Sequence, residues 1–176
     1  VMGPLYPFGF GLSYTEFSYD NATLRALDDC KVEIQVEVTN TGDVTGDEII
    51  QCYLRDDFTS VANYEIMLKG FERITLDPGE TQTVSFVLDK RSMEFVNAQH
   101  EWVVEPGTFT VMIGRNSEDM EARLSFEVYR DASGELATRL PIRRAAGAAP
   151  VAPANRHDTI FQGRLHEGEE RADTAI

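Results

Sequence analysis

The stretch Lys31-Val32-Glu33-Ile34-Gln35-Val36-Glu37-Val38 decides the fold of this chain. Valine and isoleucine alternate in it with charged or amide side chains, and this period of two is typical of a β-strand with one buried face. The same alternation returns at residues 50–54, 84–88, 109–113 and 124–128, and we predict another strand over 68–76. No stretch keeps the i, i+3, i+4, i+7 apolar pattern of an amphipathic helix for three turns.

Glycine and proline turns separate the predicted strands, as in Asp77-Pro78-Gly79 and Glu105-Pro106-Gly107. Six or seven one-faced strands with such connections predict an all-β fold, an antiparallel β-sandwich. The turn Asn40-Thr41-Gly42-Asp43 suggests that residues 31–54 form a hairpin. The longest connection is 56–67, and a binding loop would lie there if the domain has one.

The composition favours a single acidic domain. The 176 residues include 30 Asp and Glu against 16 Lys and Arg, which gives a net charge of −14. Nucleic acids and anionic membranes both require a basic face, so we expect neither as a partner. No apolar run approaches the roughly 18 residues of a membrane span.

Charge and aromatic content divide the chain into three parts. Residues 1–129 contain 23 acidic and 9 basic residues, whereas residues 130–176 contain 7 of each and an Ala/Pro-containing run. We predict a sandwich over 20–129 and a polar, largely disordered tail over 130–176. Residues 1–19 hold six of the 17 aromatic residues, interrupted by glycine and proline. We interpret them as an interdomain strap, and the start at Val1 as a cut from a longer protein.

The two cysteines are predicted to be buried and free. If residues 31–54 form a hairpin that turns near Asp43 and Val44, Cys52 lies opposite Gln35, about 17 Å from Cys30. A disulfide needs Cα atoms within about 7 Å. The thiols do not indicate the compartment of the protein, and no signal peptide is visible.

We predict no catalytic, cofactor-binding or metal-binding residue in this chain. Four acidic doublets occur, but neighbours on a strand point to opposite faces and therefore make no carboxyl pair. These doublets are Asp28-Asp29, Asp47-Glu48, Asp56-Asp57 and Glu169-Glu170. The three histidines, His100, His157 and His166, form no zinc motif. The Gly11–Thr15 segment lacks the final glycine of a nucleophile elbow.

Two roles are open for the single tryptophan, Trp102. An exposed indole ring could stack on a sugar, but a lone tryptophan beside Val103 and Val104 is more often a packing residue. We therefore expect Trp102 to pack in the core.

Five strings, in order, resemble a module of glycoside hydrolase family 3, the family of β-glucosidases and β-xylosidases. One of them, residues 38–48, is similar to the module's first hairpin. Residues 4–15 are similar to its P-L-Y-P-F-G-[FY]-G-L-S-Y-T segment, and 68–76 to its L-K-G-F-x-R-[IV] strand. Residues 77–81 match its P-G-E-T turn, and 102–109 its W-x-V-x-P-G-x-[FY] element. The strings extend over about residues 3–129. Residues 62–67 depart from the family pattern, and the tail after Tyr129 has no counterpart.

The resemblance implies a fibronectin type III/immunoglobulin-like sandwich. The family's catalytic residues lie in an upstream barrel and an upstream α/β domain, and no residue here matches them. The resemblance thus implies the C-terminal, non-catalytic structural domain of a β-glycosidase that hydrolyses O-glycosyl bonds. It implies that this domain packs on the upstream barrel and α/β domains, and that a β-linked glycoside substrate is a partner only through them. Without those domains, the strap is expected to expose an apolar patch. The alternative is a free-standing carbohydrate- or protein-binding sandwich module.

Overall fold

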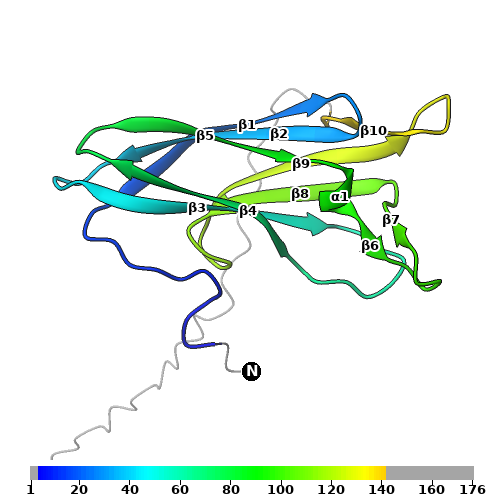
Figure 1. Cartoon of the computed structure of the whole chain (residues 1–176), viewed down its shortest axis with the longest axis horizontal. Helices are drawn as coiled ribbons and strands as arrows, with labels where there is room; N and C mark the ends of the chain where they lie inside the picture. The colour runs from blue at the N-terminus through cyan, green and yellow to red at the C-terminus, as the bar shows by residue number, and fades with distance from the viewer. Residues whose placement is uncertain (1–3, 142–176) are drawn as a thin grey trace, which may run out of the picture. The chain divides into compact units, whose positions relative to one another are not determined.

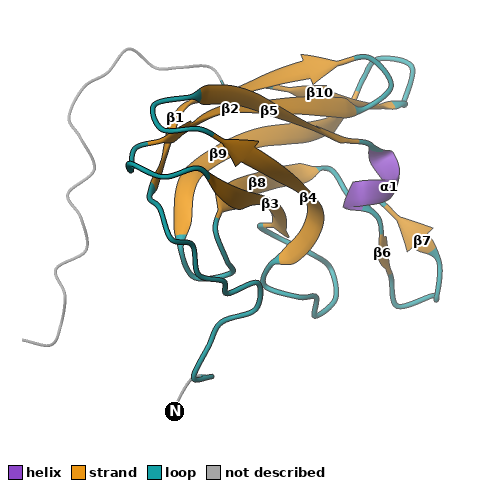
Figure 2. Ribbon diagram, turned by 60° about the vertical axis from the view of Figure 1, so that its left-hand side comes forward, coloured by secondary structure: helices purple, strands orange, loops and turns teal. Residues whose placement is uncertain are grey.

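The computed structural model describes residues 4–141, which form two antiparallel sheets packed face to face (Figures 1 and 2). The smaller sheet has the order β1-β2-β5 and consists of β1 (Phe17–Leu27), β2 (Lys31–Asn40) and β5 (Thr81–Leu88). The larger sheet has the order β10-β9-β8-β3-β4. It consists of β10 (Leu136–Arg139), β9 (Met120–Arg130), β8 (Gly107–Gly114), β3 (Gly46–Asp56) and β4 (Met67–Leu76). The predicted all-β sandwich is confirmed.

A short connection at one end of the sandwich links β5 to β8. It contains the four-residue helix α1 (Lys90–Met93) and a two-stranded ribbon of β6 (Phe95–Val96) and β7 (Trp102–Val103). The carboxylate of Asp89 caps α1 by accepting hydrogen bonds from the main-chain and side-chain donors of Ser92. The buried side chains of Met93, Phe95 and Val104 attach this connection to the domain.

The core lies between the sheets and comes from the alternating positions that predicted the strands. The buried side chains of β2 and β5 are Val32, Ile34, Val36, Val38, Val84, Phe86 and Leu88. Those of the facing sheet include Ile50, Cys52, Leu54, Phe109, Val111, Ile113, Phe126 and Val128. Phe109 and Phe126 stack with ring centroids 5.4 Å apart. Each fully buried aliphatic or aromatic side chain of this kind contributes about 1.5–3 kcal/mol to the hydrophobic stabilisation.

The predicted hairpin over residues 31–54 is wrong. β2 pairs with β1 and β5, whereas β3 pairs with β4 and β8 in the other sheet. The segment after Asn40 crosses between the sheets. A period of two places one face of each strand in the core but carries no information on which strand is the neighbour. Cys30 and Cys52 are nevertheless both buried and free, as predicted.

Four strands were not predicted: the short β6 and β7 of the ribbon, and β1 and β10 of the two main sheets. β1 contains a register shift between Asp20 and Thr23, and Asn21 there has φ 51°, so the alternation of faces is interrupted. β10 pairs with β9 through Leu136–Arg139, so the larger sheet continues beyond residue 129, where the sequence places the end of the folded domain. The rest of the predicted tail, with His157, His166 and Glu169-Glu170, lies outside the described residues.

Candidate docking surface

Residues 4–16, which we call the strap segment, run from the N-terminal side to β1 and are tied to the sandwich by hydrogen bonds. The amide of Ser117 donates to the carbonyl oxygen of Phe8 at 2.9 Å, and that of Thr41 donates to the carbonyl oxygen of Glu16 at 2.8 Å. The Thr15 hydroxyl donates to Oδ1 of Asn40 at 2.7 Å. The strap segment is therefore held at both its middle and its end.

Gln51 makes the contact between the strap segment and β3. Its Nε2 donates to the carbonyl oxygen of Gly9 at 3.0 Å and to that of Arg115, while Tyr53 donates its hydroxyl proton to Oε1 of Gln51. Gln51 and Tyr53 are buried although they alternate with the core residues Ile50, Cys52 and Leu54. The centre of β3 is thus buried on both faces, which the one-faced sequence pattern did not predict.

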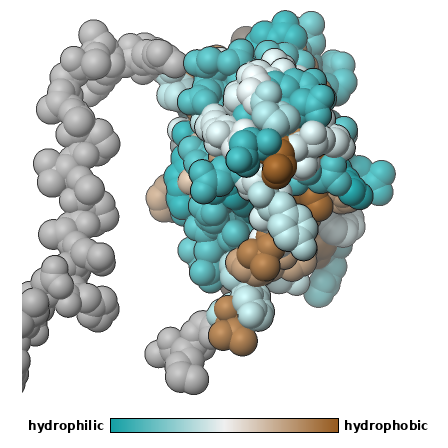
Figure 3. Space-filling model, turned by 90° about the vertical axis from the view of Figure 1, so that its left-hand side faces the viewer, coloured by the Kyte–Doolittle hydropathy of each residue, from teal (hydrophilic) through white to brown (hydrophobic). Residues whose placement is uncertain are grey.

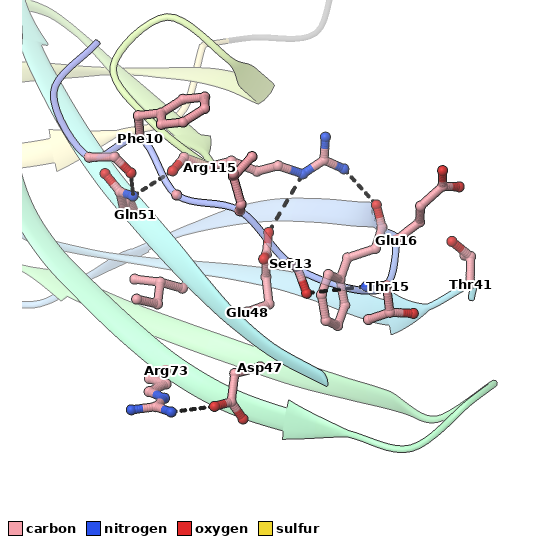
Figure 4. Close-up of a pocket in the computed structure, with 15 residues that line it drawn as sticks. Phe10, Ser13, Thr15, Glu16, Thr41, Asp47, Glu48, Gln51, Arg73 and Arg115 are labelled. Carbon is pink, nitrogen blue, oxygen red and sulfur yellow. Dashed lines mark hydrogen bonds and ion pairs between the residues drawn. The ribbon is translucent and has the colours of Figure 1, made fainter. Parts of the chain in front are cut away.

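A hollow of about 670 Å³ lies between the strap segment and the ends of β3 and β4 (Figure 4). Arg115 is its central cation: its guanidinium lies 3.5 Å from the carboxylate of Glu48 and 3.1 Å from that of Glu121. It also donates to the carbonyl oxygen of Phe17 at 2.6 Å. Arg115 therefore joins β1, β3 and β9 under the strap segment.

Glu48 and Tyr19 form the buried part of this network. The Tyr19 hydroxyl donates to Oε1 of Glu48 at 2.7 Å. Burial raises the pKa of the Glu48 carboxyl, although Tyr19 and Arg115 both oppose the rise by stabilising the carboxylate. Burial and the neighbouring Glu48 also raise the pKa of Tyr19, which stays a neutral hydrogen-bond donor. The network is structural: its polar groups satisfy one another.

The outer side of the strap segment is apolar and exposed. Leu12 and Tyr14 are 91% and 101% exposed. Further large, exposed apolar side chains of the segment are Leu5, Tyr6, Phe8 and Phe10. Ile49 and Phe71, on the outer face of β3 and β4, are exposed as well. Figure 3 shows apolar surface on this side of the molecule, toward the N-terminal residues. We call these residues together the strap surface.

The exposed apolar residues that the sequence predicts for this segment are thus present. Large apolar side chains that gather on one exposed segment in this way are typical of a site of contact with another protein surface.

In the doublets Asp47-Glu48 and Asp56-Asp57 the two neighbouring carboxylates have different surroundings. Asp47 accepts hydrogen bonds from Arg73 and Thr75, while Glu48 binds Tyr19. Asp57 binds Arg55 and Thr110. Asp56, beside it, has a buried Oδ2 without a hydrogen-bond partner, and burial raises its pKa from 3.8 to about 6.

The part of the chain that the structure describes contains no cluster of three or more His, Cys, Asp or Glu residues that could hold a metal ion. Within the same residues no helix has the length and apolar character needed to cross a membrane.

The expectation that Trp102 packs in the core is wrong, since its side chain is 70% exposed. Trp102 pairs with Val96 across the β6–β7 ribbon, and Phe95 pairs with Val103. Paired residues share a face, so the buried Phe95 sets the inner face and leaves Trp102 on the outer one. The apolar neighbours Val103 and Val104 suggested burial, but only the register of the ribbon determines which side faces the core.

Comparisons with known proteins agree with the sandwich. A family model described as a fibronectin type III-like domain matches residues 48–117. A β-xylosidase from Formosa agariphila is 54% identical over 120 residues, which cover 65% of this chain and 16% of that protein. A thermostable β-glucosidase B from Acetivibrio thermocellus is 43% identical over 129 residues, covering 71% of this chain and 17% of that protein.

A solved structure has the same fold over the matched region. The crystal structure of a GH3 β-glucosidase from Bifidobacterium adolescentis superposes with a TM-score of 0.67 at 35% identity, over 69% of this chain and 18% of that one. The chain spans about one sixth of the length of the curated relatives described above.

Proposed function

Because this chain carries a fibronectin type III-like domain homologous to a domain of β-xylosidases and family 3 β-glucosidases, we propose that it is the non-catalytic C-terminal structural domain of a β-glycosidase. The larger enzyme hydrolyses the O-glycosyl bond of a β-linked glycoside. The reaction needs two carboxyl groups that converge on the bond. The carboxylates of Asp47, Glu48 and Asp57 each accept hydrogen bonds from different side chains, which supports a structural role for them.

The observation that carries the proposal is the strap surface. Leu12 and Tyr14 are almost completely exposed, yet the segment that presents them is tied to Asn40, Gln51 and Ser117 by hydrogen bonds. An ordered apolar surface binds a partner with a smaller loss of conformational entropy than a free chain terminus would.

The occupant that we propose is the upstream part of the same enzyme, with its barrel and α/β domains. The relatives are about six times longer than the matched region, so a large body of chain is available to cover the strap surface. The net charge of −14 argues against nucleic acid or an anionic membrane as the occupant.

A chimera tests this function. The segment of the Formosa agariphila β-xylosidase that aligns with this chain is replaced by the corresponding residues of this chain, and hydrolysis of an aryl β-xyloside is measured. We expect an active chimera, and no hydrolysis by the isolated 176-residue chain. A folded but inactive chimera contradicts the proposal, as does turnover by the isolated chain.

Surface variants show whether the strap surface is the contact. Leu12→Asp and Tyr14→Asp are expected to abolish the activity of the chimera and to leave unfolding of the isolated chain unchanged, because both side chains are exposed. Val87→Asp is the matched control, since Val87 is an exposed apolar residue on the outer face of β5 in the other sheet. If the chimera with both Leu12→Asp and Tyr14→Asp remains active, the strap surface is not the contact with the upstream domains.

A further inference from the structure

A second hollow lies at the opposite end of the sandwich from the attachment of the strap segment at Asn40. It has a volume of about 450 Å³ and is lined by four separate segments: the β1–β2 turn, the start of α1, β7 and the β9–β10 hairpin. Its side chains include Asp29, Lys90, Trp102, Arg130, Glu135 and Leu136. β2 runs from Lys31, next to this hollow, to Asn40, and ten strand residues span about 30 Å. The hollow therefore lies about 30 Å from the attachment of the strap segment at Asn40.

Trp102 is presented rigidly at this hollow. Its side chain is exposed, while Phe95, Met93 and Val104 around its main chain are buried in the domain. The ribbon register fixes the outward direction of the indole. An aromatic ring that is held in place and open to solvent loses little entropy when a ligand stacks on it.

The charged groups of the hollow are balanced. Two bases, Lys90 and Arg130, and two acids, Asp29 and Glu135, line it, and all four are exposed. This local neutrality contrasts with the net charge of −14 of the whole chain. Asp29 also forms an ion pair with Lys31 at 3.6 Å, and Arg130 donates to the carbonyl oxygen of Gly134 at 3.0 Å. A ligand with a charge of either sign would meet a like charge as well as an opposite one here, whereas a neutral ligand with many hydroxyl groups can donate to the carboxylates and accept from the bases.

A sugar ring fits this combination of groups. One side of a β-linked pyranose presents C–H groups, which pack on an indole face, and its rim presents hydroxyl groups that both donate and accept hydrogen bonds. We propose that the hollow beside Trp102 is a saccharide-binding site that takes a chain of β-linked glucose or xylose units. The hollow itself does not depend on the proposed enzymatic role, but the choice of these two sugars rests on that proposed function.

The chain contains a single tryptophan, so its intrinsic tryptophan fluorescence reports on Trp102 alone. The full 176-residue chain is titrated with cellohexaose and with xylohexaose while the emission is recorded. We expect a saturable change in intensity and a blue shift for at least one of the two oligosaccharides, because stacking shields the indole from water. No change up to the solubility limit of both oligosaccharides overturns the proposal.

Variants locate the site by calorimetric titration with the oligosaccharide that binds. Trp102→Ala is expected to weaken binding at least tenfold, and Trp102→Phe, which keeps an aromatic face, to weaken it less. Tyr64→Ala, which removes an exposed aromatic ring from the β3–β4 connection, is the matched control and should bind like the parent chain. Unchanged affinity in Trp102→Ala, or loss of affinity in Tyr64→Ala, overturns the assignment to this hollow.

The two proposals fail in different experiments. An inactive chimera contradicts the enzymatic role and leaves the fluorescence titration of the isolated chain unaffected. Conversely, an active chimera together with unchanged tryptophan fluorescence in both oligosaccharide titrations contradicts only the saccharide site. If Trp102→Ala disrupts the folded assembly of the chimera, the hollow is a contact between domains and the saccharide proposal is overturned.

Discussion

Asn40, completely buried at the end of β2, accepts a 2.7 Å hydrogen bond from the hydroxyl of Thr15 in the strap segment. The same Oδ1 accepts from the amide of Gly42, and Nδ2 donates to the carbonyl oxygens of Val44 and Leu76. All the hydrogen-bonding groups of this side chain are satisfied. Asn40 thus links the strap segment, the crossing between the sheets and the end of β4.

Asn40→Ala is expected to lower the free energy of unfolding by about 3 kcal/mol, because it leaves buried carbonyl groups without donors. Chemical denaturation measures this loss. Asn63→Ala, at an exposed position of the β3–β4 connection, should change stability by no more than about 0.5 kcal/mol. Equal effects of the two changes would contradict the linking role of Asn40.

Gly9→Ala is expected to release the strap segment. Gly9 has φ 81°, in the left-handed region, and a Cβ there would collide with the side chain of Gln51. Hydrogen exchange at the amides of Phe10 and Ser117, which donate within or to the strap segment, should accelerate. Gly11→Ala is the control, because a Cβ at Gly11 has no atom within 4 Å and the exchange should stay slow.

Arg115→Ala is expected to destabilise the domain by about 2 kcal/mol near pH 8, because it leaves the buried carboxylate of Glu48 without its nearest cation. Burial already raises the folded-state pKa of Glu48 above 4.5, so its ionisation disfavours the folded state as the pH rises. The loss should therefore be smaller at pH 4, where the carboxyl is protonated in much of the population. Urea unfolding at both pH values measures the difference. A loss that is equal at both would show that Glu48 does not depend on Arg115.

Asp56→Asn is expected to stabilise the domain by about 1–2 kcal/mol at pH 7, a value reduced for partial solvent screening. The pKa of Asp56 rises from 3.8 in the unfolded chain to about 6 in the folded domain. Below pH 3.8 both states are protonated; as the pH rises to about 6, the unfolded state ionises first and the domain loses stability. The gain from Asp56→Asn should therefore disappear near pH 4.

The neighbouring Asp57→Asn should have the opposite effect. Asp57 accepts from Nε of Arg55 at 2.8 Å and from the Thr110 hydroxyl, so its loss should cost about 1 kcal/mol at pH 7. Thermal unfolding of the two variants side by side gives the comparison. Destabilisation by both changes would contradict a net cost of burying the Asp56 carboxylate, whose Oδ2 has no hydrogen-bond partner.

The strands that the sequence predicts are those with an unbroken period of two, such as β2 with Val32, Ile34, Val36 and Val38. β1 was not predicted because its register shift near Asn21 interrupts the alternation of buried and exposed side chains. The strap surface is partly predictable, since an aromatic segment broken by glycine and proline fits no strand of its own. Its attachment through Gln51 is not predictable, because the hydrogen bond to Gly9 joins residues 42 positions apart.

The sequence by itself determined the fold class, the buried face of most strands and the family resemblance, because each depends on the order of side chains along a short stretch. The tertiary structure decided which strands are neighbours, that β3 is buried on both faces and that Trp102 faces solvent. These features depend on pairing between distant segments, and a pattern with a period of two is compatible with many pairings. The register of the partner strand therefore determines whether a single residue is buried. In the β6–β7 ribbon, Val103 pairs with the buried Phe95, so its neighbour Trp102 lies on the opposite, exposed face.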